Sequence, residues 1–261
     1  MPRALPRKNF YSPNLIRLLS DLALVETREP KGAFAEELGL WLNLDDAITL
    51  HAVHAAGSAP PLPRSGSTEK VALNEDFTRL RANLEKLDMP DGSTNPSSSR
   101  TDMTATPRVV LNDAPASYEP YRRSYVAHQR TMESSIRTFR AKVRDVLTRT
   151  SPTLAKLAAL DAVFDKSLFE RERKLLTMVP SLLEKRFKQL RQAHQQTLAD
   201  RQDAVGTEDT EDRATSINPE TWLRRFCQEL QAVVRAELDA RLEPTLGLIE
   251  AYNLEIANIH E

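Results

Sequence analysis

The residues best suited to chemistry form a stripe of four arginines in the middle of the chain, one every seven positions: Arg123, Arg130, Arg137 and Arg144. A helix places residues seven apart on one side, and at about 1.5 Å per residue they follow one another every ~10 Å. Such a row suits an anionic partner, either the phosphates of a nucleic acid or an acidic protein face. Intramolecular pairing, for which the acid-rich last helix could supply partners, or a solvated flank is the favoured interpretation, because charged rows are common on long helices.

Two histidines one helical turn apart, His51 and His54, follow the acidic pair Asp45 and Asp46. Two imidazoles at this spacing can share a metal ion, but zinc needs a third and a fourth ligand at recognisable spacing. The other histidines form no motif with the pair: His128, His194 and His260. We therefore expect no metal site, and ordinary histidines at a helix end.

The one cysteine, Cys227, follows Phe226 in the last predicted helix. A nucleophilic thiol requires a base and a group that orients it, and the chain has neither of the signatures GxSxG and HExxH. The glycine-rich patterns GxGxxG and GxxxxGKS/T, which cradle phosphates, do not occur either. The sequence predicts a half-buried structural thiol, no cofactor, and a protein that is not an enzyme.

Three tyrosines, Tyr118, Tyr121 and Tyr125, are interleaved with arginines. Aromatic and basic residues in this order can stack and hold unpaired bases. The favoured interpretation is that the rings pack the start of a helix against the rest of the protein. Trp41 and Trp222 are likewise expected to anchor the core.

The composition of the 261-residue chain is that of a helical protein. Only 7 residues are glycine, while Leu, Ala, Arg, Glu and Gln are abundant, and these favour helix over sheet. The formal charge of -1 does not indicate a globally basic nucleic-acid binder. The chain has no signal-peptide pattern and no apolar run of the ~20 residues that a membrane span requires, so we expect a cytoplasmic protein.

The elements that must position these side chains are long helices around a central stretch, residues 151–200. Its apolar residues recur at helical spacing, and Pro180 predicts a kink because it lacks an N–H. Ser151-Pro152 stops the preceding helix and starts this one, so the two helices should form an antiparallel pair. The preceding helix carries a heptad seam of large apolar residues: Tyr125, Met132, Ile136, Phe139, Val143 and Val146.

The predicted fold is all-α and has three parts. Residues 10–87 form a small N-terminal unit of short helices, one of them at 33–42. Residues 88–117 are too rich in Ser, Thr, Pro, Asp and Asn to bury a core, which predicts a disordered linker. Residues 118–261 form an antiparallel bundle of long helices with coiled-coil character. These helices are expected at about 118–150, 152–200 and 219–259, the last one bent near Pro244.

Segments from nearly the whole chain together resemble one helical family. They are NLIRLLSDLALVE, FAEELGLWLNLDDAITLHAVH, YEPYRRSYVAHQRTMESSIR and SPTLAKLAALDAVFDKSLFERERKLLTMVPSLLEKRFKQLR. The chain is similar to an uncharacterised "domain of unknown function" family of Burkholderia-type proteobacteria, whose pattern has no catalytic motif to transfer. The resemblance implies that the gene for this protein lies near genes for MotA/TolQ-like membrane proteins and OmpA-like cell-wall-binding proteins. It therefore implies a cytoplasmic accessory to an envelope or motor-like assembly, for example one that serves in defence.

The sequence thus predicts a non-enzymatic helical scaffold or adaptor that acts through protein–protein interaction with unidentified partners. The heptad seam also makes the chain a candidate homo-oligomer, because a second copy can complete an apolar seam. The alternative function is nucleic-acid binding by the arginine stripe. An enzyme of unknown type is the least favoured.

Overall fold

The computed structural model describes the following residues: 14–22, 24, 42, 44–55, 66–86, 117–204 and 221–259. Within these ranges the regular structure is entirely helical, which confirms the predicted all-α class. The helices are α1 (Asn14–Asp21), α3 (Leu44–Ala55), α4 (Gly66–Glu85), α5 (Glu119–Thr150), α6 (Pro152–Leu176), α7 (Val179–Ala204) and α8 (Thr221–Ile259). The predicted linker at 88–117, except Ser117, and the predicted helix at 33–42, except Leu42, lie outside the described residues.

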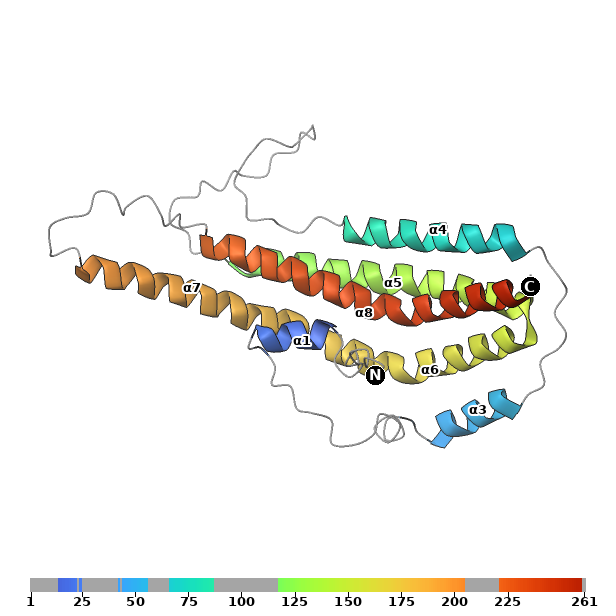
Figure 1. The fold of residues 1–261 in the computed structure, drawn as a ribbon. Coiled ribbons are helices and arrows are strands. Elements are labelled where there is room, and N and C mark those ends of the chain that lie inside the picture. Colours follow the sequence, from blue (N-terminus) through green and yellow to red (C-terminus); the bar gives the residue numbers. More distant parts are fainter. Residues whose placement is uncertain are drawn as a thin grey trace, which may run out of the picture.

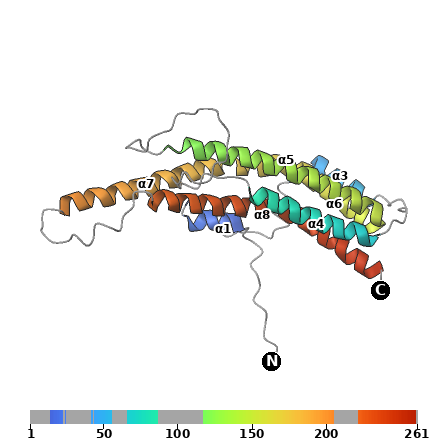
Figure 2. The same ribbon diagram turned by 90° about the horizontal axis from the view of Figure 1, so that it is seen from above.

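The long helices form a bundle in which α5 and α8 lie side by side in the central layer (Figure 1). Helix α4 covers one side of this pair, and α6 with α7 covers the other (Figures 1 and 2). Helices α5 and α8 run in the same direction (Figure 1), because α6 and α7, which connect them in the chain, run the opposite way. None of the helices in the described ranges combines the length and the apolarity that a bilayer crossing requires.

The corner between α5 and α6 forms as the sequence predicts. Ser151 has an extended backbone, and its side-chain oxygen accepts a hydrogen bond from the backbone N–H of Leu154 at 3.2 Å. Pro152 occupies the first position of α6, where its missing N–H costs no helical hydrogen bond. This one-residue break turns the chain back, so α5 and α6 pack as an antiparallel pair.

The predicted helix at 152–200 is divided in two by a turn at Thr177 and Met178. The break lies just before Pro180, which cannot donate a hydrogen bond to the carbonyl four residues earlier, that of Leu176. In the last helix, by contrast, α8 continues through Pro244.

The six residues of the heptad seam are all buried, with between 0% and 9% of their surface exposed. They belong to three apolar clusters along the bundle, and α4, α6 and α8 all contribute residues to the clusters that hold Met132 to Val146. The seam is thus covered within one chain. It leaves no open apolar face on α5 for a second copy to complete.

The described helices of the predicted N-terminal unit pack separately on the long helices. Helix α1 contacts α8, and its Leu15 and Leu19 join an aromatic cluster that includes Phe187 and Phe226. Helix α3 contacts α6, and α4 contacts α5 and α8. The long helices therefore organise the short ones.

Candidate functional site

The arginine stripe is divided by its contacts with α6. Arg144 binds two aspartates of α6: its Nε lies 2.6 Å from Asp161 Oδ2, and its Nη2 lies 2.8 Å from Asp165 Oδ2. Arg140 binds the same two carboxylates at 2.5 and 3.0 Å. The carboxylates that bind Arg140 and Arg144 thus come from α6, whereas the sequence suggested that the last helix could supply them. Two arginines four residues apart face two aspartates four residues apart, which fixes the register of α5 against α6.

The other three arginines of the stripe differ from Arg144 and from one another. The guanidinium of Arg137 lies over the ring of Phe169 of α6, 4.5 Å from its centroid, as in a cation–π contact. Arg123 is 78% exposed and pairs with Glu119 within α5 at 3.0 Å. Arg130 is exposed and forms no ion pair with another described residue. The stripe is therefore not one continuous surface.

A buried polar layer lies where α5 and α8 meet, and its centre is the fully buried carboxylate of Glu237. Tyr125 donates its hydroxyl hydrogen to Glu237 Oε2 at 2.5 Å. The side-chain amide of Gln129 donates to both carboxylate oxygens at 3.0 and 3.1 Å. Arg241, one turn further along α8, donates to Oε1 at 2.9 Å. Glu237 thus has the donors that a buried carboxylate needs.

The pKa values of Tyr125 and His128 in the polar layer are shifted so that both side chains stay uncharged. Burial raises the pKa of the Tyr125 hydroxyl well above its ordinary value, and the nearby carboxylate of Glu237 raises it further. Tyr125 therefore remains a hydrogen-bond donor. Its neighbour His128 is 5% exposed, and its Nε2 has no hydrogen-bond partner among the described residues. Burial lowers the pKa of His128, although Glu237 opposes this shift, so the imidazole is held neutral.

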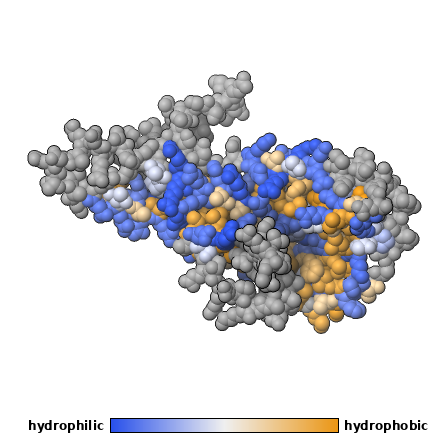
Figure 3. Space-filling view, viewed as in Figure 1, coloured by the Kyte–Doolittle hydropathy of each residue, from blue (hydrophilic) through white to orange (hydrophobic). Residues whose placement is uncertain are grey.

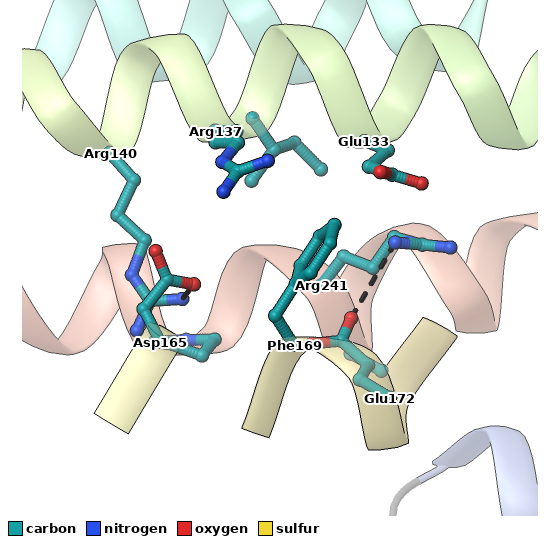
Figure 4. Close-up of a pocket in the computed structure, with 10 residues that line it drawn as sticks. Glu133, Arg137, Arg140, Asp165, Phe169, Glu172 and Arg241 are labelled. Atoms are coloured by element: carbon teal, nitrogen blue, oxygen red, sulfur yellow. Dashed lines mark hydrogen bonds and ion pairs between the residues drawn. The ribbon is translucent and has the colours of Figure 1, made fainter. Parts of the chain in front are cut away.

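A small charged cavity lies between Arg241 of the polar layer and the ion pair of Arg140 with Asp165 (Figure 4). Its volume is about 60 Å³, which is room for about two water molecules and far below the ~300–1,000 Å³ of pockets that hold drug-sized ligands. Arg241 reaches across it toward Glu172, with Nη1 3.5 Å from Oε1. Three arginines and three carboxylates line it: Arg137, Arg140, Arg241, Glu133, Asp165 and Glu172. The charges balance and the volume is small, so the cavity suits water better than a charged substrate.

Pro244 also contributes to this cavity. Because proline has no N–H, the carbonyl of Ala240 lacks its helical donor, and both residues line the cavity. Partial burial raises the pKa of the Glu172 carboxyl at the rim, and Arg241 opposes that shift. The cavity thus combines a backbone acceptor with side chains that hold charge.

The model of the family described as Protein of unknown function (DUF3348) matches residues 1–254. The chain belongs to this family. Comparison with curated proteins and with solved structures gives no match. Membership of DUF3348 agrees with the resemblance to a domain of unknown function, and the family description assigns no activity.

In this DUF3348 protein the three tyrosines at the start of α5 are 0–8% exposed. Tyr118 and Tyr121 pack on Phe187 and Phe226, with ring centroids 5.3–6.1 Å apart. Their rings are therefore closed to nucleic-acid bases. Trp222 packs edge-on to Phe187 at 5.2 Å, whereas Trp41 lies outside the described residues.

The cysteine and the histidine pair that the sequence singled out in this DUF3348 protein differ in exposure. Cys227 is 2% exposed in the aromatic cluster, more deeply buried than the sequence suggested. His51 and His54 are exposed on α3. Among the described residues no three His, Cys, Asp or Glu side chains are grouped closely enough to hold a metal ion.

Sequence reasoning missed the polar layer and the aspartate pair of α6. The signal for the layer was a polar residue at an apolar position, because Gln129 lies in the heptad seam four residues after Tyr125. Glu237 likewise follows the buried Leu230 by seven residues on the apolar side of α8. The signal for the ion pairs was a shared spacing of four residues, between Arg140 and Arg144 and between the two aspartates of α6.

Proposed function

We propose that this DUF3348 protein is a non-enzymatic scaffold or adaptor that binds a protein partner through the outward face of α3. The observation that supports the proposal is an apolar face on a docked helix. Leu44 is 75% exposed and Ile48 is 58% exposed, one turn apart on α3. Figure 3 shows hydrophobic surface in the region where Figure 1 places α3. Exposed apolar patches of this kind commonly mark interaction sites.

The opposite face of α3 holds the helix in place. Its partly buried residues are Asp46, Leu50 and Val53, which share the side that faces α6. The hydroxyl of Ser167 on α6 donates to Asp46 Oδ1 at 2.7 Å. One face of α3 therefore docks on the bundle while an apolar face remains available to a partner.

The bundle beneath α3 is suited to a scaffold. The paired aspartates of α6 hold α5 against α6, and Glu237 holds α5 against α8. Such contacts allow one register of the helices, so a surface carried by α6 keeps a constant shape. The finer proposal, a cytoplasmic accessory to an envelope or motor-like assembly, rests on the resemblance to the Burkholderia-type family.

The test compares two variants as bait in a lysate of the native host. One carries Leu44→Ser and Ile48→Ser, and the other carries Leu254→Ser, whose parent side chain is 67% exposed on α8. We expect a partner identified by mass spectrometry to be captured by the natural chain and by the Leu254→Ser control, and at least tenfold less by the α3 variant. Equal capture by all three, with unchanged helical circular dichroism, would contradict the proposal.

A second candidate function, nucleic-acid binding, is favoured only by the exposed arginines at the start of α5. Arg122 and Arg123 are 55% and 78% exposed, and Arg130 follows on the same helix. Binding there should weaken steeply with salt and disappear in an Arg123→Gln, Arg130→Gln variant. An absence of DNA or RNA retardation at low salt would exclude it.

A further inference from the structure

The turn between α6 and α7 places two large apolar side chains on the surface. Leu175 is 62% exposed and Met178 is 56% exposed. Figure 1 shows that α6 and α7 meet at an outward bend, on the side that faces away from α5 and α8. Exposed apolar residues that lie together among polar ones mark a surface for a protein or a membrane.

The turn holds these two side chains outward. Their neighbours Leu176 and Val179 point into the bundle, where Val179 is 2% exposed and Leu176 packs against the aromatic cluster. Backbone hydrogen bonds continue through the turn. The N–H of Met178 donates to the carbonyl of Leu175 at 3.1 Å, and the N–H of Ser181 donates to the carbonyl of Met178 at 3.1 Å. Leu175 and Met178 therefore cannot turn inward without displacing buried neighbours.

Basic residues surround the two apolar side chains. Residues 170–188 hold six Lys or Arg and three Glu, whereas the whole chain has a formal charge of -1. One of the six, Arg186, pairs with Glu229 of α8. The other five are exposed: Arg171, Arg173, Lys174, Lys185 and Lys188. The bundle is therefore locally positive at this turn.

Two of the three glutamates in this stretch are paired. Glu172 turns toward Arg241 in the charged cavity, with its Oε1 3.5 Å from Nη1. Glu184 binds Lys188 at 2.6 Å. Glu170 is therefore the one remaining acidic residue of the stretch, and it cannot offset the positive charge on both sides of the turn.

An anionic membrane surface matches this combination of side chains. Apolar side chains that project from a bend can enter the boundary between headgroups and acyl chains, while lysine and arginine attract the anionic headgroups. A nucleic acid would use the positive charge but leave both apolar side chains in water. A second copy would bring the same positive charge to the same face, so the two copies would repel each other.

We propose that the outer side of the α6–α7 turn docks on anionic lipid bilayers, with Leu175 and Met178 inserted and the surrounding cations at the headgroups. The contact is peripheral, because only two side chains enter the bilayer. Its electrostatic part falls off within a Debye length, so binding weakens as salt is added.

The first test measures co-sedimentation of the full-length protein with vesicles of phosphatidylglycerol or of neutral phosphatidylcholine. We expect at least tenfold stronger binding to phosphatidylglycerol. The double variant Leu175→Ser, Met178→Ser should lose that binding at least tenfold. The control Leu254→Ser should bind as the natural chain does, because this leucine of α8 is 67% exposed but lies between Glu250 and Glu255.

The second test compares two double variants that change the net charge equally. Lys174→Gln with Lys185→Gln should weaken binding to phosphatidylglycerol at least tenfold. Arg149→Gln with Arg235→Gln removes two exposed arginines from α5 and α8 and should weaken it less than twofold. Equal losses in the two variants would overturn the proposal, because attraction would then follow the net charge and not the turn.

A polarity-sensitive dye reports insertion directly. Attached to Met178→Cys, its emission should shift to the blue with phosphatidylglycerol vesicles, whereas on Leu254→Cys it should not shift. The native Cys227 is buried and common to both proteins. An unshifted dye at position 178, or binding that survives the two serine substitutions, would overturn the proposal. A dimer seen by light scattering and abolished by those substitutions would also overturn it, because a second copy would then cover the turn.

Discussion

Gln129 of α5 donates its side-chain amide to the carbonyl oxygen of Leu176, at 3.0 Å, where α6 ends. Pro180 removes the helical donor of that carbonyl, and the glutamine replaces it. The same amide binds Glu237 of α8. On the other side of the turn, Tyr118 donates its hydroxyl hydrogen to the carbonyl of Pro180 at 2.6 Å. Helix α5 thus holds the break between α6 and α7 from both sides.

Replacement of Gln129 by Leu should destabilise the protein because it leaves the Leu176 carbonyl and the Glu237 carboxylate short of a donor. The expected loss in the free energy of unfolding is about 2–3 kcal/mol, since the Glu237 carboxylate is buried and charged and the Leu176 carbonyl is partly buried. Urea denaturation followed by circular dichroism measures it. The matched control, Gln196→Leu on the exposed surface of α7, should change the free energy by less than ~0.5 kcal/mol. Equal effects of the two substitutions would contradict the role of Gln129.

Replacement of Glu237 by Ala should have a larger effect. Glu237 is 0% exposed, and its removal leaves Tyr125 and Arg241 without their buried acceptor. Breaking a buried charge pair in this way costs about 3–5 kcal/mol. Thermal unfolding compares this variant with Glu243→Ala, which removes an exposed carboxylate from the same helix. A melting temperature unchanged in both variants would show that the polar layer does not stabilise the bundle.

The same substitution should destabilise the protein at one arginine of the stripe and have little effect at another. Arg144→Ala leaves Asp161 and Asp165, which are 12% and 22% exposed, with one arginine instead of two, and should cost about 2–4 kcal/mol. Arg130→Ala, two heptads earlier on the same face, removes an exposed side chain and should cost less than ~0.5 kcal/mol. Urea midpoints of the two variants measured side by side decide this. Similar midpoints would mean that the ion pairs of α6 contribute nothing.

The buried His128 predicts a loss of stability in mild acid. Burial lowers its pKa below the ordinary value of 6.5, so the unfolded chain binds a proton more readily than the folded one. The free energy of unfolding therefore falls as the pH drops below 6.5, by up to ~1.4 kcal/mol per pH unit, until the pH passes the lowered pKa. The dependence should be smaller in His128→Leu.

The matched control for this pH dependence is His54→Leu, which removes an exposed histidine from α3. Urea titrations at pH 7.5 and pH 5.5 should show the full acid sensitivity in this control and in the natural chain. If His128→Leu loses as much stability between the two pH values as the control does, the buried imidazole is not its source.

The sequence by itself determined the features of this protein that depend on local chemistry. Helical periodicity predicted the all-α class, and Ser151-Pro152 predicted the corner between α5 and α6, because capping and proline act within one turn. The heptad seam correctly identified the buried side of α5. Pro180 placed the kink of the central helix within a few residues of the observed turn.

Only the tertiary structure decided which residues meet. Tyr125 and Glu237 are 112 residues apart, and their contact depends on the rotation and the axial position of α5 against α8. The same reason explains why the carboxylates that bind Arg144 come from α6 and not from α8. Charge rows show which partners are compatible, but several acidic helices satisfied that condition here. Packing of the apolar faces selects one register among them. This selection depends on the sum of many weak contacts along the whole length of each helix.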